Sequence, residues 1–339
     1  MTDTLPFRWY ADEELLRRER AAIFASSWQY AGRSELVAAP GSYLATDAGG
    51  IPILVTRDAD GALRAFVNVC RHRGAVLTDG CGTRRTIQCR YHAWTYGLDG
   101  SLRSAPRSDR EPGFDSSEWS LLPASVGVWG PFLFVNPSAD APTLEEELGE
   151  LPAILAQVVD VNELLFHSRV AFGANANWKI VVENFLECYH CPTAHPAFAD
   201  DVDVHPDRYR LDARATFAAQ YATQRTSGLQ GQFHLLYPNT GINVFPGPGN
   251  LSIGPILPAA PSRTERYLDY FFAPGVDDAW RDDFFAYDDQ IGKEDTQLVE
   301  SVHRGMASGM LDHGRLLADA EPLVAAFQSW VAARLQVDA

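Results

Sequence analysis

The chain contains 339 residues, carries a net charge of −16 and is 46% apolar. Its length suggests two domains, and its apolar content is sufficient for folded cores rather than disorder. The negative charge would repel nucleic acid and anionic membrane surfaces, so the composition excludes both as partners. No run of about 18 apolar residues is present that would span a membrane.

The first residues and the cysteines bear on the compartment. Charged side chains recur through residues 1–25 without the apolar core of a secretory signal, which predicts a cytoplasmic protein. Five cysteines are too few for a disulfide framework in a chain of this length. In a reducing compartment clustered cysteines more often bind metal, so those that lie near histidines are candidate ligands.

The N-terminal part of the chain predicts a helix followed by short strands. Residues 11–26 have helical character, and from 41 to 136 short apolar segments alternate with turn residues. Segments 51–57 and 62–69 predict one hairpin, and Asp99-Gly100 closes a second. This block therefore predicts a small antiparallel β domain.

The C-terminal part mixes helices and strands. Residues 178–190 predict an apolar helix that begins after Asn177, whose side chain suits the first backbone N–H groups of a helix. The other predicted elements are an acidic helical connector at 141–160, strands at 163–175 and within 209–273, and helices at 277–308 and 314–335.

These elements predict an α+β fold in three parts. We expect residues 1–40 to form a helical segment that packs on the last domain, and residues 41–140 to form the antiparallel β domain. Residues 141–339 should form a domain with a central antiparallel sheet flanked by helices.

Two Cys-His pairs form the first candidate metal site. Cys70 and His72 enclose one residue, Cys89 and His92 enclose two, and 16 residues separate the pairs. Thiolates suit ferric iron and neutral imidazoles on a second iron raise the potential, so this mixture favours a [2Fe–2S] cluster. A mononuclear zinc site is the alternative, although zinc fingers pair Cys with Cys and His with His.

A second candidate site follows Asn177. Glu187 and His190 are three residues apart, so a helix would place them on one face. Pro192 ends the regular helix and lets His195 fold back beside His190. Two histidines and one carboxylate form the facial triad of non-haem Fe(II) oxygenases, which leaves positions open for O2. We interpret the remaining cysteines as packing residues: Cys81, Cys188 and Cys191.

Both motifs resemble those of Rieske non-haem iron oxygenase alpha subunits, the catalytic subunits of the ring-hydroxylating oxygenase family. The resemblance rests on Cys70-Arg-His-Arg-Gly74, on Tyr91-His-Ala-Trp94 and on the segment 177–195, and Ala93 stands where glycine is common. It implies that the thiolates of Cys70 and Cys89 bind one iron of the cluster and that the imidazoles of His72 and His92 bind the other. It also implies that two further histidines, His190 and His195, bind a mononuclear Fe(II).

The resemblance also implies the third ligand of the mononuclear iron. The family places an aspartate far downstream in a C-terminal helix, and Lys293-Glu-Asp295 is the matching text, which makes Asp295 the candidate ligand. Three nearby acids compete for this role: Asp288, Asp289 and Glu294.

The acid at position 187 has a different implied role. In the family it accepts hydrogen bonds from the first iron-binding histidine, here His190, and from a cluster histidine, here His92 of the partner subunit. Aromatic ring dioxygenases usually have aspartate there, with one more residue between it and the asparagine that corresponds to Asn184. The longer acid and shorter spacing of Glu187 resemble the choline, carnitine and betaine oxygenases, which act on quaternary ammonium compounds.

The C-terminal half is rich in aromatic residues that would suit a substrate pocket. Such rings would bind a quaternary ammonium by cation–π attraction or an aromatic substrate by stacking. Asn243, Phe245 and Phe285 are the candidate pocket residues.

The resemblance implies a complete reaction and its partners. Electrons from NAD(P)H would arrive through a separate flavin- and iron–sulfur-dependent reductase, and O2 would hydroxylate a small organic substrate, with oxidative N-demethylation as one outcome. In the family the two centres of one subunit are too far apart for electron transfer, so a head-to-tail homotrimer is implied. The alternatives are an aromatic ring-hydroxylating dioxygenase or O-demethylase, an electron-transfer Rieske protein, and a zinc-stapled binding module.

Overall fold

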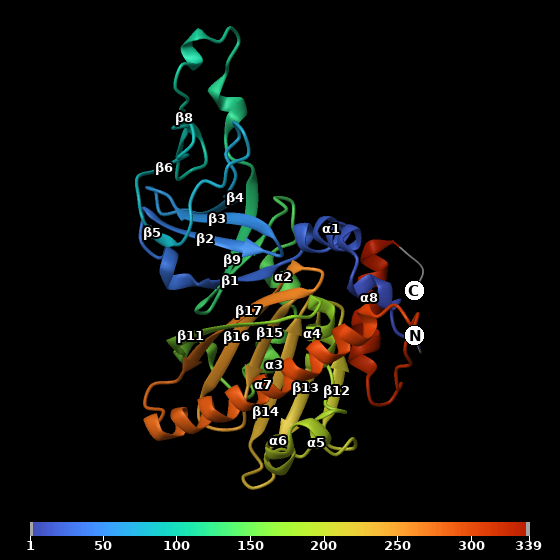
Figure 1. The fold of residues 1–339 in the computed structure, drawn as a ribbon. Helices are drawn as coiled ribbons and strands as arrows, with labels where there is room; N and C mark the ends of the chain where they lie inside the picture. The colour runs from blue at the N-terminus through green and yellow to red at the C-terminus, as the bar shows by residue number, and fades with distance from the viewer. Residues whose placement is uncertain (1–2, 337–339) are drawn as a thin grey trace. The chain divides into compact units, whose positions relative to one another are not determined.

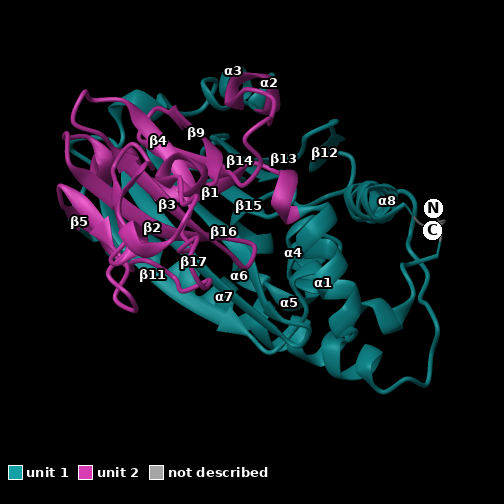
Figure 2. Cartoon of the chain, turned by 90° about the horizontal axis from the view of Figure 1, so that it is seen from above, with its two compact units in different colours: residues 1–23, 148–339 teal, residues 24–147 magenta. Residues whose placement is uncertain are grey.

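The computed structural model describes residues 3–336. The chain folds into two compact units, coloured separately in Figure 2. One unit comprises residues 24–147, and the other combines the described residues up to Ile23 with those from Leu148 onward. Both contain antiparallel sheets, and long helices occur in the second, which confirms the α+β class. Within residues 3–336 no helix is long and apolar enough to cross a membrane.

The unit of residues 24–147 is built on a seven-stranded sheet with the strand order β1-β10-β9-β4-β3-β2-β5. Its apolar strands bury branched side chains such as Ile53, Val55 and Val135 completely, and each such burial stabilises the fold by roughly 1.5–3 kcal/mol. The strands are β1 (Gln29–Arg33), β2 (Ser42–Ala48), β3 (Ile51–Arg57), β4 (Leu63–Val67), β5 (Cys81–Thr83), β9 (Pro123–Trp129) and β10 (Phe132–Asn136).

Both predicted hairpins are present in this unit. β3 pairs with β4, and the Asp58 carboxylate closes their turn by accepting hydrogen bonds from the N–H groups of Asp60 and Ala62. The second hairpin joins β7 (Thr95–Gly97) to β8 (Leu102–Ser104), and β6 (Thr86–Gln88) completes a small sheet. Its turn requires glycine because Gly100 has a φ of 83° and a Cβ there would lie 2.3 Å from Phe66.

The second unit is also built on a seven-stranded antiparallel sheet, with the order β11-β17-β16-β15-β14-β13-β12. Helices α4 and α7 contact each other and the strands of this sheet (Figure 1). The strands are β11 (Leu165–Ala174), β12 (Arg210–Ala213), β13 (Phe217–Thr223), β14 (Gln230–Leu236), β15 (Thr240–Val244), β16 (Asn250–Ala260) and β17 (Arg263–Phe272). The helices are α1 (Glu13–Ala22), α3 (Leu151–Leu155), α4 (Trp178–Phe185), α5 (Cys191–Ala194), α6 (Pro196–Asp201), α7 (Asp278–Ala307) and α8 (Pro322–Leu335), and α2 (Leu144–Leu148) joins the units.

The unit boundaries differ from the expected divisions at 40/41 and 140/141. β1 lies within the expected N-terminal segment, yet it pairs with β10, so the β unit already begins at Phe24. The last helix also starts later than expected, at Pro322, because the preceding backbone bonds to the N-terminal segment instead: the Thr4 N–H donates to the Gly314 carbonyl.

A buried ion pair anchors the N-terminal end of helix α4 to helix α1. The Asn177 side chain accepts a hydrogen bond from the Lys179 N–H, as its expected cap role requires. Lys179 Nζ donates to Glu19 Oε1 of α1 at 2.6 Å, and both side chains are fully buried. Trp178 Nε1 donates to the other oxygen of Glu19 at 2.8 Å, so α1 fixes the start of the helix that leads to Glu187.

We expect Lys179→Met to lower the free energy of unfolding of this unit by about 3–5 kcal/mol, because it leaves the Glu19 carboxylate buried without its counter-charge. Adding Glu19→Gln should recover much of the loss, since it removes the buried charge and keeps an acceptor for Trp178. Urea denaturation followed by circular dichroism would measure both. A loss below about 1 kcal/mol for the single variant would be typical of an exposed pair and would contradict the argument.

Candidate metal centres

The two Cys-His pairs meet within the β unit, on two loops of similar construction. Cys70 and Cys89 are both buried and neither forms a disulfide. The rings of His72 and His92 lie 4.6 Å apart between centroids, and His72 stacks on Trp94. Two buried thiols and two adjacent imidazoles are a donor set that can hold a [2Fe–2S] cluster, with the thiolates on one iron and the imidazoles on the other.

The loops are closed by equivalent backbone hydrogen bonds. The Gly74 N–H donates to the Cys70 carbonyl, and the Ala93 N–H donates to the Cys89 carbonyl. Both donors adopt left-handed backbone, with φ of 73° at Gly74 and 59° at Ala93. This conformation explains why glycine suits position 93, and alanine there costs about 1–2 kcal/mol.

The neighbourhood of Cys70 contains a further polar group. The Tyr96 hydroxyl lies 3.5 Å from Cys70 Sγ and accepts a hydrogen bond from the Arg71 N–H at 3.0 Å. Burial raises the pKa of Tyr96, so it stays a neutral phenol. While its oxygen accepts from Arg71, its O–H can donate to a thiolate at Cys70, which is the form of sulfur that binds iron.

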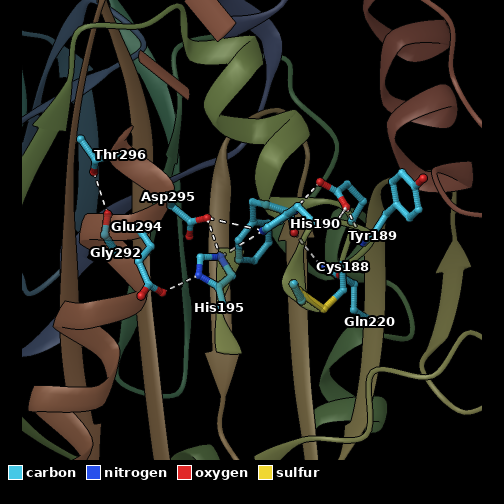
Figure 3. Close-up of polar contacts among 12 residues, drawn as sticks. Cys188, Tyr189, His190, His195, Gln220, Gly292, Glu294, Asp295 and Thr296 are labelled. Carbon is cyan, nitrogen blue, oxygen red and sulfur yellow. Dashed lines mark hydrogen bonds and ion pairs between the residues drawn. A yellow bond between two sulfur atoms is a disulfide. The ribbon is translucent and has the colours of Figure 1, made fainter. Parts of the chain in front are cut away.

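In the second unit, His190, His195 and Asp295 converge from three places in the chain (Figure 3). One ligand atom from each lies within 4.8 Å of the others. The Nε2 atoms of the two histidines are 3.1 Å apart, and Asp295 Oδ1 lies 3.0 Å from His195 Nε2 and 3.6 Å from His190 Nε2. Two histidines and one carboxylate facing one point fit a non-haem iron site with open positions.

Two further carboxylates orient the imidazoles. Glu187 Oε1 contacts His190 Nδ1, and Glu294 Oε2 lies 2.7 Å from His195 Nδ1. An ionised carboxylate only accepts, so Glu187 and Glu294 each hold a proton on the Nδ1 they contact, which leaves the Nε2 atoms as the ones that can bind a metal ion.

The charges around the three converging side chains shift the pKa values of His190 and Asp295. Burial opposes protonation of His190, but the carboxylates of Asp295 and Glu187 outweigh it and raise the pKa to about 9. Burial acts to raise the pKa of Asp295, yet His190 and His195 lower it to about 2. The Asp295 carboxylate is therefore ionised at neutral pH, and together with Glu187 it favours a positive charge at His190.

The acids that compete with Asp295 occupy other positions on α7. Asp288 Oδ2 accepts a hydrogen bond from the Tyr270 hydroxyl at 2.6 Å, and Asp289 pairs with Lys293. Glu294 contacts the far nitrogen of His195 rather than the centre. The sequence pattern offered no means to separate these acids, because they differ only in their phase on one helix.

Two expectations about this segment were wrong. The helix ends at Phe185 rather than continuing to His190, and a separate short helix starts at Cys191. Cys188 and Cys191 are also not independent packing residues, since they form a disulfide with their Cα atoms 4.9 Å apart. Without a continuous helix the chain turns at residues 186–190, which brings the two cysteines together and still leaves Glu187 against His190.

The expectation that Cys81 packs within its loop was also wrong, since Cys81 is an exposed free thiol on β5.

A cavity of about 430 Å³ opens beside the three converging side chains. Its size lies within the range of small-molecule sites. Glu187, His190, His195 and Asp295 line it together with the three expected pocket residues, Asn243, Phe245 and Phe285. The further aromatic side chains of the lining are Phe172, Phe185, Phe198, Tyr209, Phe233 and Tyr270. Two cations also line it: Lys293, which pairs with Asp289, and Arg266.

Family models match both units of the chain. Residues 27–122 match the Rieske [2Fe-2S] domain, and residues 161–337 match the ring hydroxylating alpha subunit (catalytic domain).

Relatives of known activity match nearly the whole chain. The oxygenase subunit of carnitine monooxygenase from Escherichia coli (strain K12) is 35% identical over 330 residues, which cover 93% of this chain and 88% of the relative. The chloroplastic choline monooxygenase of Amaranthus tricolor is 30% identical over 345 residues, which cover 97% and 77%. A solved structure of a quaternary ammonium Rieske monooxygenase is also similar, with a TM-score of 0.87 and 31% identity over 98% of this chain and 96% of that one. That protein is described in terms of carnitine oxidation by gut microbiota and of inter-subunit electron transfer.

Proposed function

Because the chain belongs to the ring-hydroxylating alpha subunits of Rieske oxygenases, and so carries a [2Fe–2S] cluster and a mononuclear non-haem iron, we propose that it hydroxylates a small quaternary ammonium compound with O2. The observation that carries this proposal is the cavity, which aromatic rings line together with His190, His195 and Asp295. Aromatic faces attract a quaternary ammonium without needing a hydrogen bond, which such a cation cannot donate. The named activities of the relatives support the same class of substrate.

We further propose the ligands of both centres. Cys70 and Cys89 bind one iron of the cluster and His72 and His92 the other, while His190, His195 and Asp295 hold the mononuclear iron. Bound there, the mononuclear iron supplies O2 activation for hydroxylation of a C–H bond, with electrons delivered through the cluster.

The protein's own side chains then have separable tasks. Glu187 and Glu294 fix the ring orientations of His190 and His195 by accepting their Nδ1 protons. The aromatic lining excludes water and holds the substrate cation. Oxygenation consumes one O2, two electrons and two protons and yields a hydroxylated product and water. When the hydroxylated carbon is bonded to the quaternary nitrogen, that C–N bond breaks and its electron pair stays on nitrogen, while the hydroxyl loses its proton, which gives an aldehyde, a tertiary amine and H+.

The partners we propose are a separate NAD(P)H-dependent reductase and two further copies of this chain in a homotrimer. Inter-subunit electron transfer in the solved relative supports an assembly in which Glu187 also contacts His92 of the partner subunit. We propose that the protein works in the cytoplasm, where such reductases have access to NAD(P)H.

Product analysis after a single turnover tests the proposed activity. The cluster is reduced chemically, substrate and O2 are added, and no reductase is needed. Carnitine, choline and glycine betaine are offered beside aromatic acids. We expect an aldehyde, with or without a released tertiary amine, from a quaternary ammonium compound. Hydroxylated or O-demethylated aromatic products, with no reaction of the ammonium compounds, would contradict the proposal.

A further inference from the structure

Arg266 brings a positive charge into a cavity whose other features suit a cation. It lies on β17, and its neighbours at alternate positions, Thr264 and Leu268, are buried, so it points to the same face of the sheet as they do. Its guanidinium carbon stands 4.5 Å from the centre of the Phe172 ring, and both residues line the cavity. One face of the guanidinium is therefore covered by an aromatic ring.

The guanidinium has no ion-pair partner within the described part of the chain. Its Nε is enclosed and makes no hydrogen bond, and no carboxylate of residues 3–336 lies within 4.0 Å of it. By contrast, Arg169 on the opposing strand is bonded through two nitrogens to Asp269, at 2.6 Å each. Arg210 of the same sheet also has no ion pair among the described residues, but it is exposed and stacks on Tyr221, whereas Arg266 lines the cavity.

The two carboxylates that act electrostatically on Arg266 are Asp288 and Asp295, and both make their hydrogen bonds to other residues. Asp288 accepts the Tyr270 hydroxyl, and Asp295 faces the two histidines. Burial lowers the pKa of Arg266, while Asp295, Tyr270 and Asp288 act through space in the opposite direction. A largely buried cation without a close counter-charge is costly, and a ligand that brings an anion to it recovers that cost as binding energy.

We propose that Arg266 binds a carboxylate of the substrate, so that the enzyme acts on trimethylammonio carboxylates in preference to trimethylammonio alcohols. This inference rests on the proposed quaternary ammonium function and adds the second recognition element. A planar guanidinium matches a carboxylate through two parallel N–H donors, and this match discriminates against a neutral amide or hydroxyl. The aromatic rings remain for the ammonium end, and a substrate held at both ends presents one carbon to the iron reproducibly.

Paired ligands that differ only in this charge test the proposal. Glycine betaine, L-carnitine and γ-butyrobetaine are compared with their carboxamides and with choline, by anaerobic calorimetric titration of the holoenzyme. We expect at least one carboxylate to bind roughly tenfold to hundredfold more tightly than its carboxamide, as expected for a hydrogen-bonded charge pair. Arg266→Gln should abolish this difference, and Arg266→Lys should retain part of it.

Arg263→Gln is the matched control, since Arg263 lies on the same strand but pairs with Glu265 away from the cavity lining. It should keep the preference for the carboxylate. If the wild type binds all carboxylates and carboxamides equally well, the role of Arg266 is contradicted while the quaternary ammonium function stands. If the wild type oxidises no quaternary ammonium compound, the function itself fails. Because the wild-type comparison needs no variant, misfolding of Arg266→Gln would not prevent a decision.

Discussion

Asp295→Ala should bind no mononuclear iron at ordinary concentrations and lose all measurable oxygenation, while its [2Fe–2S] cluster remains intact. Within residues 3–336, Asp295 is the only carboxylate of the group that converges with His190 and His195, and we propose it as the anionic ligand. Loss of an outer partner of a metal ligand already costs roughly 10–100-fold in affinity or activity, so loss of a ligand should cost more. Iron analysis should fall by one iron per chain, and the visible absorption of the cluster should not change.

Asp282→Ala is the control for this experiment. Asp282 lies on the same helix, is exposed and is absent from the cavity lining. It should keep its full iron content and turnover. Full iron content in Asp295→Ala would instead mean that another carboxylate completes the site, and Glu294 would be the first candidate because it already contacts His195.

The sequence predicted the parts of these sites whose residues are close in the chain. Cys70 with His72, and Cys89 with His92, sit on short loops, so their spacing already restricts where the side chains lie. Hairpins behaved similarly, because a turn such as Asp99-Gly100 determines the pairing of its flanking strands.

Features that depend on distant contacts were not predictable in the same way. The contact of His195 with Glu294 joins residues 99 positions apart, and nothing local distinguishes Glu294 from the acids beside it. Apolar periodicity continued past Phe185, although the chain turns there and the disulfide forms beyond it. For Arg266 a signal did exist: one arginine interrupts the buried face of an alternating strand, which indicates either a partner or a ligand opposite it.

Glu187→Gln should keep both iron centres and yet lose turnover by roughly 10–100-fold. The substitution preserves the shape of the side chain and removes its charge. Glu187 accepts from the N–H of His190 at 3.1 Å and contacts His190 Nδ1, and its side chain is only 12% exposed. A neutral amide there weakens the hold on His190 and, in the proposed trimer, on His92 of the partner subunit.

Two measurements separate these contributions. The first is the iron affinity of the catalytic unit, which reports on the orientation of His190. The second is the rate at which a chemically reduced cluster is reoxidised when substrate and O2 are added, which reports on electron transfer. We expect the reoxidation rate to fall far more than the iron affinity. Glu187→Asp is the matched variant, because it keeps the charge on a shorter side chain and should recover part of the rate.

The pattern of failure is as informative as the size of the effect. If iron affinity and reoxidation rate fell together, Glu187 would act only by orienting His190, and the contact with His92 of the partner subunit would be unnecessary. Normal turnover in Glu187→Gln would contradict both roles. The proposed bridge predicts a third result: slow reoxidation of the reduced cluster, a mononuclear site that is fully loaded with iron, and partial rescue of the rate by Glu187→Asp. Only a carboxylate that joins the two centres accounts for that combination, since neither centre is altered by itself.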